Sequence, residues 1–268
     1  MGSVGGVTDA SARSPWRAVV IPSEHGGWEL TLEPVLLGLL VAPSIAGVAI
    51  GVAAFLAFLV RTPLKVVLVD RHRHRELARD RLARRVVTVE LVALTVAVVT
   101  ALARAGFDWV VPFAIVLPLF GIELWFDARS RSRRLLPELC GAVGISAVAA
   151  AIALAGGESS SLAMALWLVL AARAVASVPF ARVQVQRLHG NPPSSRPSDV
   201  AQAAGIALAA LAVAVDSAVL AGALAVVVLA ILQFAWSRGP ARPAIAVGVS
   251  QLGFGLAVVA ATAIGIAA

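Results

Sequence analysis

The sequence has few charged residues and a single cysteine. Only 14% of its 268 residues are Asp, Glu, Lys or Arg, whereas a soluble domain carries about a quarter, so the composition excludes a soluble globular protein. Cys140 has no second cysteine to pair with, which excludes a disulfide framework and a thiolate metal cluster. The first 20 residues contain no apolar core followed by a small-residue cleavage site, so we expect no cleaved signal peptide.

Long apolar runs fill most of the remaining chain. Hydrophobic residues make up 60% of the sequence, and the mean hydropathy is +0.91. One membrane span needs about 20 apolar residues. The runs therefore predict an all-α integral membrane protein with a bundle of about nine transmembrane helices, at 31–46, 47–62, 86–103, 109–126, 138–155, 162–180, 200–215, 217–236 and 243–266. We expect one domain over 23–268, after a disordered cytoplasmic tail at 1–22; eight helices are the alternative, if the first pair is a single re-entrant unit.

Basic residues occur at every second break between the apolar runs. Of the 22 Lys and Arg residues, only Arg104 lies at a break of the other parity. By the positive-inside rule, this predicts a multi-pass protein of the bacterial inner (plasma) membrane with a cytoplasmic N-terminus and an external C-terminus. Attraction of these residues to anionic lipid headgroups is sufficient to explain the net charge of +7. Nucleic acid is therefore not predicted as a partner.

The stretch SEHGGWELTLEP, at residues 23–34, places acidic groups at the start of the first apolar run. Glu29 and Glu33 are four residues apart and lie on one face if this segment is helical. The two glycines after His25 disfavour an earlier helix start, so we expect His25 in a tight turn that returns towards that face. Two carboxylates and an imidazole can bind a divalent metal, bind a cationic group or relay protons.

Cations cluster at the ends of the second and sixth predicted helices. Arg61 and Lys65 are found at the first of these ends, and Arg173, Arg182 and Arg187 at the second. Arginine grips phosphate or carboxylate with paired donors, so an anionic ligand between these helix ends is one interpretation. The other is that the cations anchor their helices at the membrane interface or lock neighbouring helices together as ion pairs.

The segment PSEHGGW at residues 22–28, followed by nine apolar spans, resembles the YwiC-like family of bacterial membrane proteins, which has a similar Pro-x-x-His-Gly-x-Trp opening. The layout is more distantly similar to the UbiA superfamily of intramembrane prenyltransferases. That likeness rests on nine helices, on polar stretches after helices two and six, and on the basic loop FDARSRSRRLLPELCG after helix four. It implies a UbiA-like bundle.

UbiA-type enzymes hold a prenyl diphosphate through Mg²⁺ on aspartate-rich motifs after helices two and six. In this chain only Asp70 follows helix two, and no acidic residue follows helix six before Asp199. The resemblance therefore implies one of two outcomes. In the first, the chain no longer performs Mg²⁺-dependent prenyl transfer. In the second, its arginines and lysine bind the diphosphate directly, and other carboxylates supply a metal site or a base.

Two functional hypotheses follow. The resemblance implies an intramembrane enzyme that acts on an isoprenoid, a prenyl diphosphate or a similar lipid with an anionic head, in a cavity open to the cytoplasm. Its catalytic residues would be His25, Glu29, Glu33 and Glu123, and its head-group ligands the five cations named above; Glu29, Glu33 and Asp70 would hold Mg²⁺. The alternative is a non-catalytic protein that transports a proton, an ion or a lipid, or that assists a respiratory complex.

Overall fold

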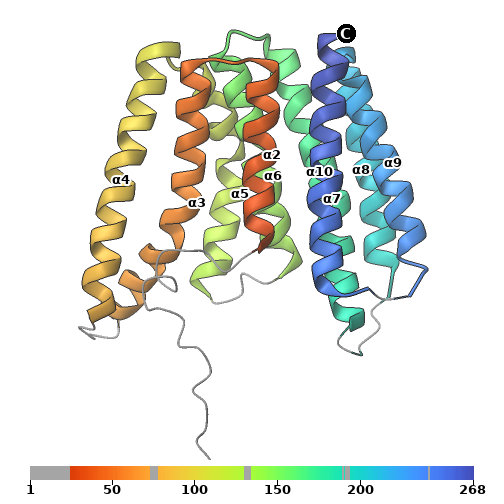
Figure 1. Cartoon of the computed structure of the whole chain (residues 1–268), viewed down its shortest axis with the longest axis horizontal. Coiled ribbons are helices and arrows are strands. Elements are labelled where there is room, and N and C mark those ends of the chain that lie inside the picture. The colour runs from red at the N-terminus through yellow and green to blue at the C-terminus, as the bar shows by residue number, and fades with distance from the viewer. Residues whose placement is uncertain (1–24, 73–77, 130–133, 189, 191–193, 241) are drawn as a thin grey trace, which may run out of the picture.

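The computed structural model describes residues 25–72, 78–129, 134–188, 190, 194–240 and 242–268. These residues form nine α-helices and two short 3₁₀ helices, with no strand among them (Figure 1). The α-helices are α2 (His25–Val41), α3 (Ile45–His72), α4 (Ala78–Ala105), α5 (Val111–Ala128), α6 (Leu135–Ala155), α7 (Ser160–Leu188), α8 (Arg196–Val215), α9 (Leu220–Trp236) and α10 (Ala244–Ala267). The 3₁₀ helices η1 (Asp108–Val110) and η2 (Ser217–Val219) precede α5 and α9.

The predicted all-helical membrane bundle is confirmed. By length and composition, eight of the described helical segments, those from α3 to α10, can each cross a membrane. The remaining helix, α2, has 17 residues and is about 25 Å long at 1.5 Å per residue. The predicted range 31–46 overlaps α2 and the first two residues of α3, and each of the other ranges overlaps one observed α-helix. The predicted tail at 1–22 lies outside the described residues.

The start of the first helix differs from the prediction. We expected His25 in a turn before two helix-breaking glycines, but α2 begins at His25 and includes both glycines. Gly27 lies against the ring of Phe58 on α3, and a Cβ at position 27 would be 2.8 Å from the Phe58 Cζ atom. The Trp28 ring meets the same phenylalanine edge-on, with 5.2 Å between the ring centroids. Close packing between α2 and α3 therefore outweighs the low helix propensity of glycine at this position.

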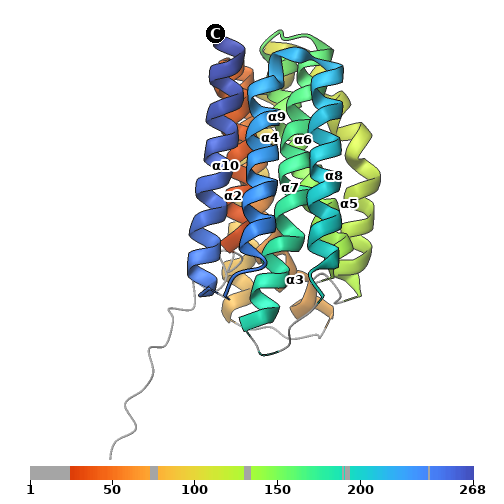
Figure 2. The same ribbon diagram turned by 90° about the vertical axis from the view of Figure 1, so that its right-hand side faces the viewer.

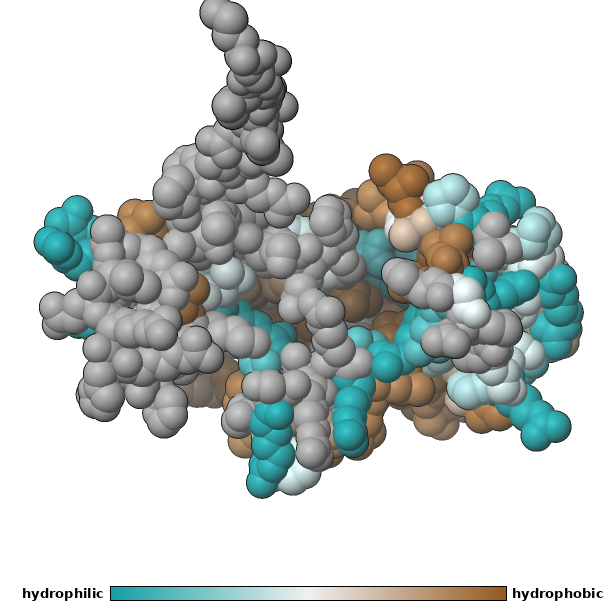
Figure 3. Space-filling view, turned by 90° about the horizontal axis from the view of Figure 1, so that it is seen from below, coloured by the Kyte–Doolittle hydropathy of each residue, from teal (hydrophilic) through white to brown (hydrophobic). Residues whose placement is uncertain are grey.

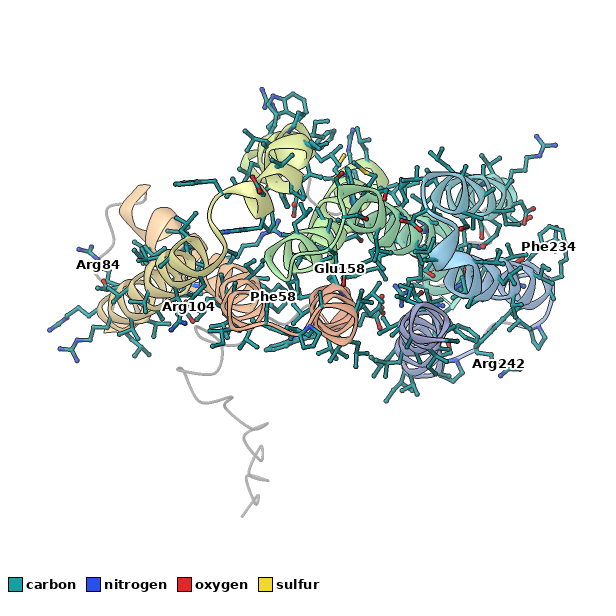
Figure 4. All side chains as sticks on the ribbon, turned by 90° about the horizontal axis from the view of Figure 1, so that it is seen from above. Phe58, Arg84, Arg104, Glu158, Phe234 and Arg242 are labelled. Carbon is teal, nitrogen blue, oxygen red and sulfur yellow. The ribbon has the colours of Figure 1, made fainter. Side chains whose placement is uncertain are left out.

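The helices form an elongated bundle with α4 at one edge and α8, α9 and α10 at the other (Figures 1 and 2). The long axis separates Arg84 of α4 from Arg242, which precedes α10 (Figure 4). Between these edges, α6 and α7 have more buried residues than any other described helix, many of them alanine. Small side chains allow membrane helices to approach closely, because dispersion contacts rather than water exclusion hold such helices together.

Successive helices alternate in direction, so helix ends rich in arginine gather at one end of the bundle (Figure 1). We call this the lower end, as Figure 1 draws it; α3 and α7 end there, and α4 and α8 begin there. Viewed from below, hydrophilic residues are exposed along the length of the molecule (Figure 3). The composition identifies a multi-pass membrane protein, and the assignment of the lower end to the cytoplasm stays a prediction.

Candidate functional site

A buried cluster of charge lies where α2, α7 and α10 meet. Arg173, near the middle of α7, is 1% exposed, and Glu33 of α2 is 2% exposed. The Arg173 Nη2 atom lies 2.8 Å from Glu33 Oε1 and 3.9 Å from Glu29 Oε1. Because both glutamates lie on one face of α2, a single guanidinium contacts both. The sequence prediction of a shared carboxylate face is therefore confirmed, and its counter-charge is Arg173.

The backbone of α10 closes the third side of this cluster. Arg173 Nη2 donates a hydrogen bond of 2.8 Å to the Gln251 carbonyl oxygen. One turn further along α10, a Cβ on Gly255 would overlap the Glu33 carboxylate and lie 2.7 Å from Arg173 Nη2. Only glycine leaves room for the ion pair at this crossing. We call Glu29, Glu33 and Arg173 the acid–guanidinium cluster.

Three glutamines extend this polar region across α8, α9 and α10. Gln233 Nε2 donates to Gln251 Oε1 over 3.2 Å and to Ser177 Oγ over 3.1 Å. Gln202 Nε2 donates to Gln233 Oε1 over 2.9 Å. We did not single out these glutamines from the sequence because only ionisable groups were weighed. The available signal was an uncharged amide within each of three otherwise apolar spans.

The other predicted cations form separate contacts between helices. Arg61 of α3 pairs with Glu123 and Asp127 of α5, at 2.5 and 3.8 Å. Arg182 of α7 pairs with Glu138 of α6 at 3.1 Å. The first two contacts join α3 to α5 and the third joins α7 to α6, so none of them involves the glutamates of α2.

Arg187, predicted to bind substrate, contacts two backbone carbonyl groups in this structure. Its two terminal nitrogens donate hydrogen bonds of 2.8 Å to the carbonyl oxygens of Ser237 and Gly239, beyond the end of α9. These carbonyls lie where a helix dipole ends, and a cation there is favourable. Arg187 therefore ties the end of α7 to the segment between α9 and α10.

The residues expected to hold Mg²⁺ are only partly described. The side chains of His25, Lys65 and Asp70 lie outside the described part of the structure. Among the described residues, no group of three or more His, Cys, Asp or Glu side chains is placed to hold a metal ion. Mg²⁺ is bound through oxygen ligands, and beside Glu29 and Glu33 the guanidinium of Arg173 takes the place of a cation. The Mg²⁺ requirement therefore stays a prediction.

The Arg182–Glu138 pair predicts a small effect on stability. Both side chains are about one-third exposed, and exposed ion pairs contribute roughly 0–1 kcal/mol. We expect Arg182→Ala to lower the free energy of unfolding by no more than about 1 kcal/mol. Denaturant titration of the purified protein in mild detergent measures this loss. A loss as large as that of a buried charge would contradict the interpretation of Arg182 as a peripheral helix contact.

Comparison with known proteins gives one finding. No curated protein and no solved structure matches the chain. The family described as YwiC-like protein matches residues 21–153, which include both glutamates of the acid–guanidinium cluster and end within α6. Arg173 and the three glutamines lie beyond the matched residues. The predicted resemblance to the YwiC-like family is thus confirmed over residues 21–153 of this membrane chain.

Proposed function

We propose that this protein binds and releases a proton or a monovalent cation at the acid–guanidinium cluster, as part of transport across or within the membrane. One observation carries the proposal: two carboxylates share one guanidinium inside the bundle. When all three groups are ionised, the formal charge is −2 from the glutamates and +1 from Arg173, which leaves −1. An uncompensated charge at membrane depth is costly, so one positive charge is favoured in addition to Arg173.

A purely structural role explains less of this arrangement. One carboxylate would neutralise Arg173 and join α2 to α7, as Glu138 does for Arg182 at the α6–α7 contact. The second carboxylate adds desolvation cost without adding a helix contact. Glu29 lies one turn nearer the lower end than Glu33, and its side chain is 18% exposed where that of Glu33 is 3% exposed. The two glutamates therefore differ in depth: Glu29 is partly accessible, and Glu33 is buried further inside the bundle.

The isoprenoid-enzyme hypothesis has less geometric support. It needs cations that can receive an anionic head group, but Arg61, Arg173 and Arg182 contact carboxylates, and Arg187 contacts carbonyl oxygens. The enzyme activity and its Mg²⁺ requirement stay predictions. A lipid comparison between a deletion strain and its parent separates the two hypotheses, because loss of an enzyme changes a specific isoprenoid lipid.

The transport proposal predicts a large effect of Glu33→Gln. We expect liposomes that contain the wild-type protein to dissipate an imposed proton or monovalent-cation gradient faster than protein-free liposomes. Glutamine keeps the shape of the side chain but cannot exchange a proton or hold a cation by charge. Glu33→Gln should therefore reduce the rate to that of protein-free liposomes, as reported by an internal pH-sensitive or cation-sensitive dye.

The matched control is Glu138→Gln, which changes a carboxylate in a different inter-helix ion pair. We expect this variant to keep the wild-type rate. Equal rates for wild type and Glu33→Gln, with both proteins folded and inserted, would overturn the proposal.

A further inference from the structure

Six buried polar side chains lie between the acid–guanidinium cluster and the lower end of the bundle, and hydrogen bonds connect four of them. They come from four helices, and each is at most 3% exposed. We call this group the amide column: Ser177 and Gln184 of α7, Ser198 and Gln202 of α8, Gln233 of α9 and Gln251 of α10. Such a set is unusual in a membrane bundle, where each polar group needs a partner.

The position of each residue along its helix gives the order of the column. Ser198 is two residues and Gln202 six residues from the start of α8, and Gln233 is three residues from the end of α9. All three are thus near the lower end, because α8 begins and α9 ends there (Figure 2). Gln184 is two turns below Ser177 on the same face of α7. The column therefore rises from Gln184 and Ser198, through the hydrogen-bonded glutamines, to Arg173.

Protein contacts satisfy only part of this column. The Gln202 amide nitrogen donates to the Ala176 carbonyl over 3.0 Å and to Gln233, and Gln233 reaches Ser177 and Gln251. Both polar atoms of the Gln184 amide, Ser198 Oγ, Gln202 Oε1, Gln251 Nε2 and Arg173 Nε are buried without a hydrogen-bond partner in the protein. A buried polar group that stays unpaired destabilises the folded protein.

The chemistry of these atoms selects one kind of ligand. Gln184 Nε2, Gln251 Nε2 and Arg173 Nε are donors, the amide oxygens are acceptors, and the Ser198 hydroxyl is both. A metal ion would satisfy only the acceptors, and an anion only the donors. Water both donates and accepts, and buried waters typically bind two to four otherwise unsatisfied polar groups.

We propose that ordered waters occupy the amide column and connect the acid–guanidinium cluster to the lower end. The role of this column as a proton route rests on the proposed function, because it would carry the proton that Glu33 exchanges. Hydrogen-bonded waters pass a proton by forming one O–H bond as the next one breaks, and each water then turns to restore the starting arrangement; the amides hold the waters in place by hydrogen bonds. The hydration itself does not depend on transport and is tested separately.

Radiolytic hydroxyl-radical footprinting in lipid nanodiscs detects bound water, because X-rays generate radicals from waters next to the labelled side chain. Cysteine reports strongly, so Ser177→Cys and Ser198→Cys are introduced singly in a Cys140→Ala background. The matched control is Ser146→Cys on α6: Ser146 is 4% exposed, and its hydroxyl donates to the Ala142 carbonyl of its own helix over 2.8 Å. We expect the two column cysteines to be oxidised several-fold faster than the cysteine at position 146.

A second measurement uses the unmodified protein and keeps the test valid if a cysteine variant does not fold. Phe180 lies between Ser177 and Gln184 on α7 and is 0% exposed. Leu37 and Leu166 of the dry apolar core are also 0% exposed. After correction for intrinsic reactivity, we expect Phe180 to be labelled several-fold faster than either leucine. The hydrated column would be overturned if Phe180 were labelled no faster than Leu37 and Leu166. It would also be overturned if the cysteines at positions 177 and 198 were oxidised as slowly as the cysteine at position 146.

Transport assays then separate the two proposals. Gln233→Leu removes the amide that joins Gln202, Ser177 and Gln251 but leaves Glu33 and Arg173 unchanged, so we expect a several-fold slower proton flux. If the column is labelled but neither Glu33→Gln nor Gln233→Leu alters the flux, the hydration holds and the proposed function fails. If Glu33→Gln abolishes the flux while the column is protected, the proposed function holds and the hydrated column fails.

Discussion

Replacing Arg173 with alanine is expected to destabilise the protein more than the loss of any other described arginine. The substitution leaves Glu33, which is 2% exposed, and the nearby Glu29 without their counter-charge. Removing one partner of a buried ion pair costs about 3–5 kcal/mol, because the remaining charge stays desolvated. We expect a loss of this size in the free energy of unfolding, measured by denaturant titration in detergent, together with a complete loss of proton or cation flux.

Two comparisons show whether this loss comes from buried charge. Arg61→Ala removes a guanidinium whose side chain is 43% exposed, so the expected cost is about 1 kcal/mol or less. The double variant Arg173→Gln/Glu33→Gln removes both members of the closest pair and should recover most of the stability, but not the flux. If Arg173→Ala were no more destabilising than Arg61→Ala, the cluster would not be a buried ion pair.

The second large effect is expected from one added methyl group on α10. In Gly255→Ala, the new Cβ would overlap the Glu33 carboxylate and crowd Arg173 Nη2. The carboxylate is held by the ion pair, so either α10 moves away from α2 and α7 or the ion pair breaks. Overpacking of this kind costs about 1–3 kcal/mol. We expect that loss in a thermal or denaturant unfolding experiment, with impaired flux in the fraction of protein that remains folded.

The same helix offers matched controls. A Cβ added at Gly248 or Gly253 would meet no atom within 4 Å. Alanine has a higher helix propensity than glycine, so Gly248→Ala and Gly253→Ala should be neutral or stabilise α10 by up to about 1 kcal/mol. If Gly255→Ala changed the free energy of unfolding no more than Gly248→Ala and Gly253→Ala, then α10 would not pack closely against the ion pair.

The helices could be predicted from the sequence because each span is a long apolar run bounded by charged or helix-breaking residues. The start of α2 could not, because it depends on the contact of Gly27 and Trp28 with Phe58, which is 30 residues away. Local propensity alone favoured a turn there. Tertiary packing determined the result.

The candidate site was predictable only in part, for a similar reason. The spacing of Glu29 and Glu33 predicted a shared face, and their position at the start of an apolar run predicted a polar site. Which cation faces them depends on the placement of α7 beside α2, and the sequence has no local signal for that choice. Arg61, Arg173 and Arg182 looked equivalent as charges near helix ends, yet their exposure ranges from 43% for the Arg61 side chain to 1% for Arg173. Burial distinguishes the candidate site from the peripheral ion pairs.

The protonation state of the glutamate pair tests the central claim most directly. Infrared difference spectroscopy of the protein in lipid bilayers separates a protonated carboxylic acid from a carboxylate by its C=O stretch. We predict that changing the pH or adding a monovalent cation alters a carboxyl band that is absent in Glu29→Gln and Glu33→Gln but kept in Glu138→Gln. If neither change alters any band assigned to Glu29 or Glu33, the cluster exchanges neither a proton nor a cation, and the account is contradicted.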